Sequence, residues 1–193
     1  MKRKLLTVSL LMLSTAMLGI SGATFADDDD DRKGGFLNRW FGGSKPGVAP
    51  VENPQYLEEC GSCHFPYQPG LLPARSWTKV MATLDNHFGE NAELPAEDAK
   101  MIKDYLLKNS ADDSNYKRSV KIMKSLRTND APLRVSETPY FLKKHDELTP
   151  KMVLNNPKVG SFSNCSACHT QAAKGSFSEK EILIPNFGAW EDD

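Results

Sequence analysis

The chain has 193 residues, of which 25% are charged and 39% are hydrophobic. It contains 24 Lys and Arg against 25 Asp and Glu, so the formal net charge is −1 at pH 7. No basic stripe is present, which excludes the electrostatic surface that nucleic-acid-binding proteins use. Beyond the apolar N-terminal segment, no stretch is apolar enough to span a bilayer.

The first 26 residues have the parts of a secretory signal peptide. A basic start at residues 2–4 is followed by an apolar stretch over 5–20, and Ala26 closes a cleavage site of small residues. An uncleaved membrane anchor is the alternative interpretation, but the apolar stretch is short for a transmembrane helix. We therefore predict export, with the mature protein in a bacterial periplasm.

Cleavage after Ala26 leaves 167 residues, enough for one large or two small domains. It removes three basic residues, so 21 Lys and Arg face 25 Asp and Glu, and the formal charge becomes −4. An acidic protein favours a partner with a basic face. Residues 27–52 begin with an acidic run and are rich in Gly, Ser and Pro, which predicts a flexible arm.

Residues 53–114 have the pattern of a first, helical domain. A short helix is expected over 56–64, and prolines then force a loop over 66–73. Another helix is expected over 95–109, because a proline opens it and acidic residues fill its first turn.

Between these helices the sequence predicts one more. Ser76 is a plausible N-cap. Apolar residues follow it at the i, i+3, i+4, i+7 spacing of one helix face. His87 extends this face, and Gly89 ends the helix.

Residues 115–193 are predicted to form a second domain with less regular structure. We expect a helix over 116–126 and a short one from Pro139 that has His145 on its apolar face. A further helix start is expected at residues 149–150. No β-rich stretch stands out, and the apolar core of this part is thin.

Two copies of the pattern C-x-x-C-H stand out, one in each predicted domain: Cys60-Gly61-Ser62-Cys63-His64 and Cys165-Ser166-Ala167-Cys168-His169. The pattern is typical of c-type haem attachment. Two thiols one turn apart can add to the two vinyl groups of one porphyrin, and the histidine is then held beneath the iron. We therefore predict two covalently bound c-type haems. The thioether residues are Cys60 and Cys63 for the first haem and Cys165 and Cys168 for the second.

The four cysteines allow two other interpretations. Four thiolates can bind one structural zinc ion, and a C-x-x-C pair can act as a redox dithiol. Neither explains why a histidine follows both second cysteines. All four cysteines lie in the two motifs, which leaves none for a disulfide.

The chain has four histidines, the number that two six-coordinate irons require. His64 and His169 belong to the motifs and are the predicted proximal ligands. His87 lies 23 residues after His64, and His145 lies 24 residues before His169. Short loops close at low entropic cost. We therefore predict His87 as the distal ligand of the first haem and His145 as that of the second; the crossed pairing needs longer loops.

Methionine is the alternative sixth ligand, and four methionines remain after processing: Met81, Met101, Met123 and Met152. Each lies in an apolar helical context, where methionine usually fills the core. Two imidazole ligands on one iron predict a low-spin iron with no open coordination position for a substrate. They also predict a lower reduction potential than methionine ligation gives. Each imidazole should donate its other N–H to a carbonyl or a carboxylate, and the loop 66–73 is a candidate source of such a carbonyl for His64.

Segments around the motifs resemble the dihaem cytochrome c family of bacterial periplasmic electron carriers. The resemblance covers most of residues 53–187 and depends on the stretches 59–64, 70–77, 87–90, 138–141, 144–145 and 164–169. It implies a mostly α, two-lobed fold, with an N-terminal lobe similar to class I cytochrome c and a largely irregular C-terminal lobe. It also implies bis-histidine haems, another c-type cytochrome as electron acceptor, and a membrane b-type cytochrome or quinol-linked donor.

We expect an electron carrier and not an enzyme. The first rival is a small dihaem peroxidase or a ligand-binding haem sensor, which requires one open or labile iron position. The histidine count argues against it, because four imidazoles saturate both irons. The second rival is the electron-entry subunit of a periplasmic reductase, which the haem sites alone do not distinguish from a carrier.

Overall fold

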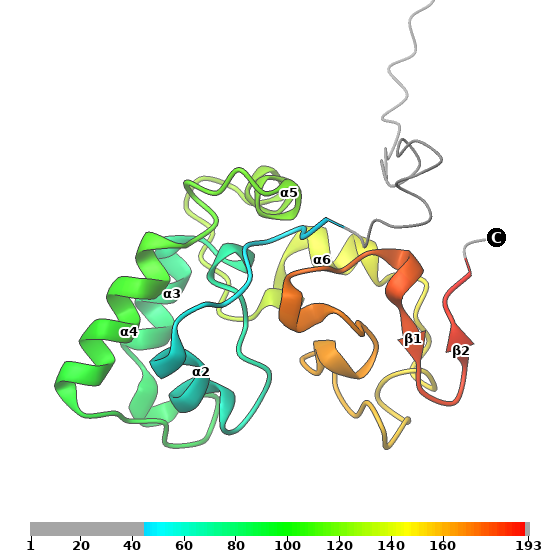
Figure 1. The fold of residues 1–193 in the computed structure, drawn as a ribbon, viewed down its shortest axis with the longest axis horizontal. Coiled ribbons are helices and arrows are strands. Elements are labelled where there is room, and N and C mark those ends of the chain that lie inside the picture. Colours follow the sequence, from blue (N-terminus) through cyan, green and yellow to red (C-terminus); the bar gives the residue numbers. More distant parts are fainter. Residues whose placement is uncertain (1–44, 192–193) are drawn as a thin grey trace, which may run out of the picture. The chain divides into compact units, whose positions relative to one another are not determined.

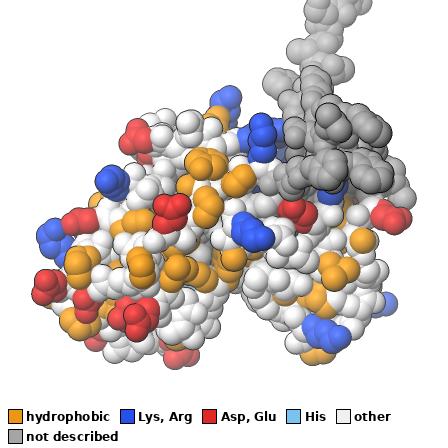
Figure 2. All heavy atoms as spheres, in the orientation of Figure 1, with side chains coloured by type: hydrophobic (Ala, Val, Ile, Leu, Met, Phe, Trp, Pro, Cys, Tyr) orange, Lys and Arg blue, Asp and Glu red, His pale blue; other side chains and the backbone are white. Residues whose placement is uncertain are grey.

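The computed structural model describes residues 45–191 (Figure 1). The predicted signal peptide at 1–26 and residues 27–44 of the predicted arm lie outside the described residues. The described chain is mostly helical, with one small sheet. Within it, no helix is long and apolar enough to cross a membrane. Charged side chains of both signs are scattered among apolar ones on the face drawn in Figure 2.

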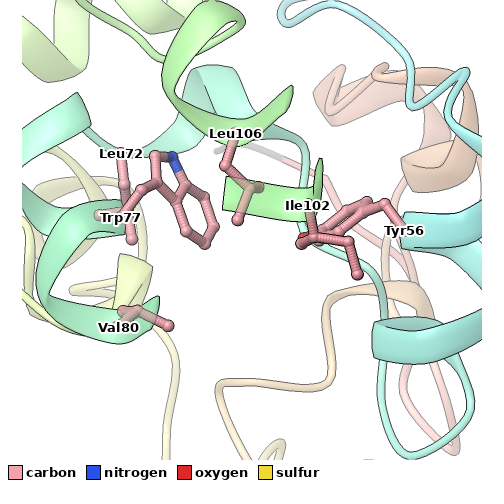
Figure 3. Close-up of a cluster of buried hydrophobic side chains, with 6 residues drawn as sticks. All are labelled: Tyr56, Leu72, Trp77, Val80, Ile102 and Leu106. Carbon is pink, nitrogen blue, oxygen red and sulfur yellow. The ribbon is translucent and has the colours of Figure 1, made fainter. Parts of the chain in front are cut away.

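Three helices contribute to the main hydrophobic core: α2 (Pro54–Gly61), α3 (Ala74–Met81) and α4 (Ala96–Lys108). The helices predicted over 56–64 and 95–109 are therefore present, with slightly different ends. The buried core consists of six side chains (Figure 3): Tyr56, Leu72, Trp77, Val80, Ile102 and Leu106. The indole N–H of Trp77 donates to the carbonyl of Pro69 at 2.8 Å, so the polar atom of this buried ring is satisfied.

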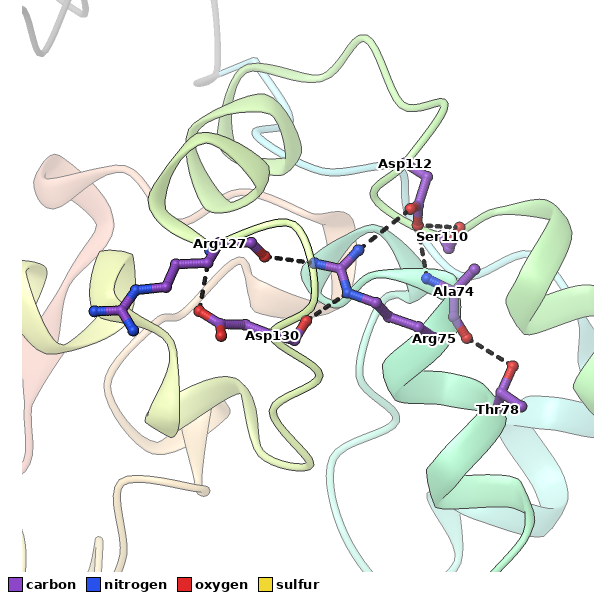
Figure 4. Close-up of polar contacts among 7 residues, drawn as sticks. All are labelled: Ala74, Arg75, Thr78, Ser110, Asp112, Arg127 and Asp130. Carbon is purple, nitrogen blue, oxygen red and sulfur yellow. Dashed lines mark hydrogen bonds and ion pairs between the residues drawn. The ribbon is translucent and has the colours of Figure 1, made fainter.

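The start of α3 differs from the prediction. Its first residue, Ala74, follows Pro73, so Ser76 lies buried inside the helix and is not its N-cap. The carboxylate of Asp112 instead accepts a hydrogen bond from the backbone N–H of Ala74 at 2.6 Å (Figure 4). An acidic group at this end of a helix also suits the helix dipole.

The end of α3 also differs, because the helix stops at Met81. The hydroxyl of Thr83 donates to carbonyls one turn back, and such local hydrogen bonds compete with a continuing helix. His87 therefore lies past α3, after the 3-10 turn Leu84–Asn86. Its backbone pairs with Glu90 in an isolated antiparallel bridge.

Arg75 joins the start of α3 to the loop that contains Arg127 and Asp130 (Figure 4). Its Nε donates to the carbonyl of Asp130 at 2.5 Å, and its Nη2 donates to that of Arg127 at 3.4 Å. Its Nη1 lies 3.8 Å from a carboxylate oxygen of Asp112. The guanidinium is thus used for tertiary structure.

Two further helices lie where the sequence predicts them. α5 spans Lys117–Ser125, and α6 spans Pro139–Lys144. The hydroxyl of Thr138 accepts a hydrogen bond from the N–H of Phe141 and caps α6. His145 lies one residue after α6, at its C-cap, and not within the helix.

After α6, the described chain consists mainly of turns and 3-10 segments. Residues 149–150, predicted to start a helix, form turns. One small sheet was not predicted: β1 (Leu183–Ile184) pairs antiparallel with β2 (Gly188–Ala189). Strands of two residues are too short to show the alternating pattern that indicates a strand.

A second, smaller cluster buries Val48, Leu71 and Ile122. Val48 belongs to the end of the predicted arm, and here that end is packed. The N–H groups of Gly47 and Val48 donate to the carbonyl of Gly175 at 2.8 and 3.2 Å. Gly175 has a φ of +74°, and a Cβ there would collide with the carbonyl of Val48, so this close approach requires glycine. The two-lobed arrangement and the boundary after residue 114 stay predictions.

Candidate functional site

The first C-x-x-C-H motif begins in the last turn of α2. Cys60 is half-buried against the main core, whereas Cys63 and His64 are exposed. Nδ1 of His64 lies 2.7 Å from the carbonyl oxygen of Phe65. The carbonyl beside this ring therefore comes from the next residue and not from the loop 66–73. A hydrogen bond at Nδ1 fixes the ring and leaves Nε2 as the nitrogen that can bind a metal.

His87 faces His64, as the short-loop pairing predicted. The two ring centroids are 6.1 Å apart and the ring planes differ by 14°. His87 also lines a pocket whose other residues are Val80, Thr83, Asn86, Phe88 and Leu133. Burial lowers the pKa of His87, and the neighbouring His64 and Arg134 lower it further. The neutral imidazole that results is the form that binds a metal.

The second motif is built differently, because residues Cys165–Ala167 form a 3-10 turn. The C-terminal segment contacts the last residues of this motif, because the N–H of Leu183 donates to the carbonyl of Cys168 at 2.9 Å. His169 pairs with Ile182 in an isolated bridge. The motif thus depends on contacts with residues beyond it, whereas the first motif begins in a helix.

His145 lies beside His169, again as predicted. Their ring centroids are 6.1 Å apart, but the ring planes differ by 76°. Nδ1 of His145 lies 2.9 Å from the carbonyl oxygen of Phe141, and the Phe141 ring stacks on the imidazole at 3.8 Å. Burial, with smaller effects of His145 and Arg118, lowers the pKa of His169 to about 3. Nδ1 of His169 is buried without a hydrogen-bond partner among residues 45–191.

The centroid separation of both imidazole pairs matches the one expected for two imidazoles that share a metal ion. Imidazole nitrogen binds first-row metals such as zinc at about 2 Å, and the ring centroid lies about 1 Å further, so a shared metal separates two centroids by about 6 Å. Both observed separations are 6.1 Å. Each pair includes the histidine of one C-x-x-C-H motif, so the residues present suit two haems. Ligation by these four histidines remains a prediction.

The geometry of the cysteines does not favour the two other interpretations. No group of three or more His, Cys, Asp or Glu among the described residues could hold a metal ion, so the four thiols do not form one zinc site. Burial raises the pKa of both Cys60 and Cys165 to about 11. A redox dithiol instead needs a cysteine with a lowered pKa.

An arginine lies close to each site, and no sequence pattern indicated that Arg118 is one of the two. At the second site, Arg118 of α5 donates from Nη1 to the hydroxyl of Tyr140 at 2.9 Å and from Nη2 to the carbonyl of Phe177. After burial, the charge of Arg118 is among the causes that lower the pKa of both His145 and His169. A single arginine far from both histidines in sequence has no pattern that would reveal this role.

At the first site, the corresponding cation is Arg134. Its guanidinium carbon lies 3.7 Å from the centroid of the Phe88 ring. Its Nε lies 3.6 Å from a carboxylate oxygen of Glu137, and 43% of its side chain is exposed. Arg134 is therefore partly neutralised and close to solvent.

Tyr67 connects the two sites. Its ring centroid is 5.5 Å from that of His64, and its hydroxyl donates to the carbonyl of Ser163 at 2.6 Å. Burial raises the pKa of Tyr67 to about 12, with an additional effect of Cys165. The ring packs against both hydrophobic clusters. One side chain thus contacts the ligand of one motif and the segment that leads into the other.

Known proteins match the chain over the region that contains both sites. A family model described as dihaem cytochrome c matches residues 56–177. The chain is similar to a diheme cytochrome type c from Shewanella baltica OS155, with 41% identity and a TM-score of 0.60, over 72% of this chain and 98% of that one. It is also similar to a diheme cytochrome c from Rhodobacter sphaeroides, with 45% identity and a TM-score of 0.60, over 67% of this chain and 100% of that one. No curated protein sequence matches the chain.

Proposed function

Because the chain belongs to the dihaem cytochrome c family and carries two covalently bound c-type haems, we propose that it is a periplasmic carrier that passes single electrons to another redox protein. The family implies haem-based electron transfer. When bound, each haem supplies a one-electron iron couple. The pair of neighbouring imidazoles at each motif is the observation that supports the proposal most.

In this proposal, the side chains attach each haem and fill both axial positions. The thioether residues are Cys60 and Cys63 at the first site and Cys165 and Cys168 at the second. The axial pairs are His64 with His87 and His169 with His145. The carbonyls of Phe65 and Phe141 lie within hydrogen-bond distance of one imidazole at each site. Rings fixed in this way move little when the charge of the site changes, which favours rapid electron exchange.

Saturated axial positions also argue against a catalytic or sensing role. A peroxidase or a ligand sensor needs one position that a small molecule can reach. At the second site, the stacked Phe141 ring covers one face of His145, and the second imidazole lies 6.1 Å away. We therefore propose that neither haem iron has an open coordination position for a substrate.

We further propose the partners that the resemblance implies. The acceptor is another c-type cytochrome, and the donor is a membrane b-type cytochrome or a quinol-linked protein. A formal charge of −4 after removal of residues 1–26 suits a partner with a basic face. An electron-entry subunit of a reductase would have the same haem chemistry, and stable copurification with a catalytic subunit would identify that role.

Two assays on the haem-loaded protein test the proposal. In the first, the reduced protein is exposed to CO, and we expect no spectral change at either haem. In the second, the reduced protein is mixed with an oxidised, basic c-type cytochrome in a stopped-flow instrument. We expect rapid electron transfer that slows as salt rises, because salt screens the attraction between the two proteins. A CO complex at either haem would contradict the proposed carrier.

A further inference from the structure

The second site has a cation whose hydrogen-bond partners are uncharged. Arg118 donates to the hydroxyl of Tyr140 at 2.9 Å and to the carbonyl of Phe177. Within residues 45–191, these two groups are the hydrogen-bond partners of its guanidinium, and no carboxylate there forms an ion pair with it. At the first site, by contrast, Arg134 pairs with Glu137 at 3.6 Å.

The position of this charge is fixed at both ends of the side chain. The backbone N–H of Arg118 donates to the carbonyl of Gly47 at 2.9 Å. A Cβ on Gly47 would lie 2.7 Å from Cδ of Arg118, so the aliphatic part of the arginine packs closely on this glycine. The guanidinium carbon lies 5.9 Å from the centroid of the Phe177 ring, and that ring lies 5.2 Å from the ring of His169. The Phe177 ring is therefore a neighbour of both the charge and the imidazole.

We propose that Arg118 is a positioning residue of the second site whose fixed charge raises the reduction potential of the second haem. This inference rests on the proposed function, because it requires a haem between His145 and His169. Oxidised haem iron has one more positive charge than reduced iron, so a nearby cation disfavours the oxidised form. A half-buried charge is screened less by salt than an exposed one.

The test compares three variants of the haem-loaded protein by redox titration. Arg118→Gln removes the charge but keeps a side-chain donor, and Arg118→Lys keeps the charge but loses the forked geometry. Arg75→Gln is the matched control, since the Arg75 guanidinium also donates two hydrogen bonds, both to backbone carbonyls, but forms no contact with either imidazole pair. The titration is followed by absorbance and by EPR, so that the two haems are distinguished.

In Arg118→Gln, we expect the reduction equilibrium of the second haem to fall about tenfold, which equals about 59 mV for a one-electron couple. The first haem should not change. In Arg118→Lys and in Arg75→Gln, the reduction potentials of both haems should stay near those of the parent protein. The inference is overturned if Arg118→Gln changes the reduction potential of neither haem, or changes both potentials equally. It is also overturned if Arg118→Lys lowers the potential of the second haem as far as Arg118→Gln does. Binding of CO to the unmodified protein would instead contradict the proposed function, so the two failures are distinguishable.

Discussion

The two haem sites share one motif and one predicted ligand set, but the protein around them differs. The first motif begins in an α-helix and packs on a core of six buried side chains. The second forms a 3-10 turn, and among the apolar side chains packed against either hydrophobic cluster only Phe177 comes from the described residues after α6. The imidazoles differ as well: His64 is exposed, whereas burial lowers the pKa of His169 to about 3. The motif therefore determines attachment, and its surroundings determine the properties of the site.

The relative orientation of the rings is the sharpest difference between the sites. Both pairs have centroids 6.1 Å apart, but the planes differ by 14° at the first site and by 76° at the second. Ring orientation affects the energies of the iron orbitals that accept density from the ligands. Two haems with the same ligands are thus expected to be spectroscopically distinct.

Removing the two cysteines of one haem attachment site at a time should have the largest effect on the stability of the fold. We expect the double substitution of Cys165 and Cys168 by Ser to unfold the region after α6, because that region buries little apolar surface without its haem. The matched substitution of Cys60 and Cys63 should leave the α2, α3 and α4 core folded. Limited trypsin digestion with mass spectrometry measures the local unfolding. We expect early cleavage at Lys151, Lys158 and Lys174 only in the variant that lacks Cys165 and Cys168. Equal protection of this region in both variants would contradict the comparison.

Removal of each predicted distal ligand should open one haem to CO. We expect His87→Ala and His145→Ala each to bind one equivalent of CO when reduced. Binding should be slower in His145→Ala, because the Phe141 ring stacks on the imidazole there, whereas Phe88 and Leu133 beside His87 are partly exposed. Flash photolysis gives both rates, and each variant is the control for the other. A variant that binds no CO would show that its histidine is not a ligand.

A smaller effect on stability is expected from removing the Tyr67 hydroxyl, which connects the two sites. Tyr67→Phe removes the hydrogen bond to the carbonyl of Ser163, and Tyr56→Phe removes a similar one to the carbonyl of Tyr67. Each should lower the free energy of unfolding by about 1 kcal/mol. Only Tyr67→Phe should separate the unfolding transitions of the two sites, because of these two hydrogen bonds only that of Tyr67 joins the segments of both sites. Chemical denaturation followed at each haem tests this, and identical behaviour of the two variants would contradict it.

The sequence predicted which histidines lie close together better than it predicted their surroundings. The cysteines and the pairing of histidines follow from short-range spacing, so the proximity of His64 to His87 and of His145 to His169 was predictable. The cap of α3 was not, because Asp112 lies 38 residues after Ala74. Arg118 was missed for the same reason, since only tertiary structure places it near His169. The angle between ring planes depends on rotamers and packing, which no sequence pattern encodes.

The EPR spectrum of the oxidised, haem-loaded protein tests the central claim most directly: that the chain builds two different bis-imidazole sites from His64 with His87 and from His145 with His169. Nearly parallel rings separate two iron d orbitals and give an ordinary rhombic low-spin signal, whereas nearly perpendicular rings leave those orbitals close in energy and give a very large maximum g value. We predict one signal of each kind and no high-spin signal. A high-spin signal, or two identical low-spin signals, would contradict the account.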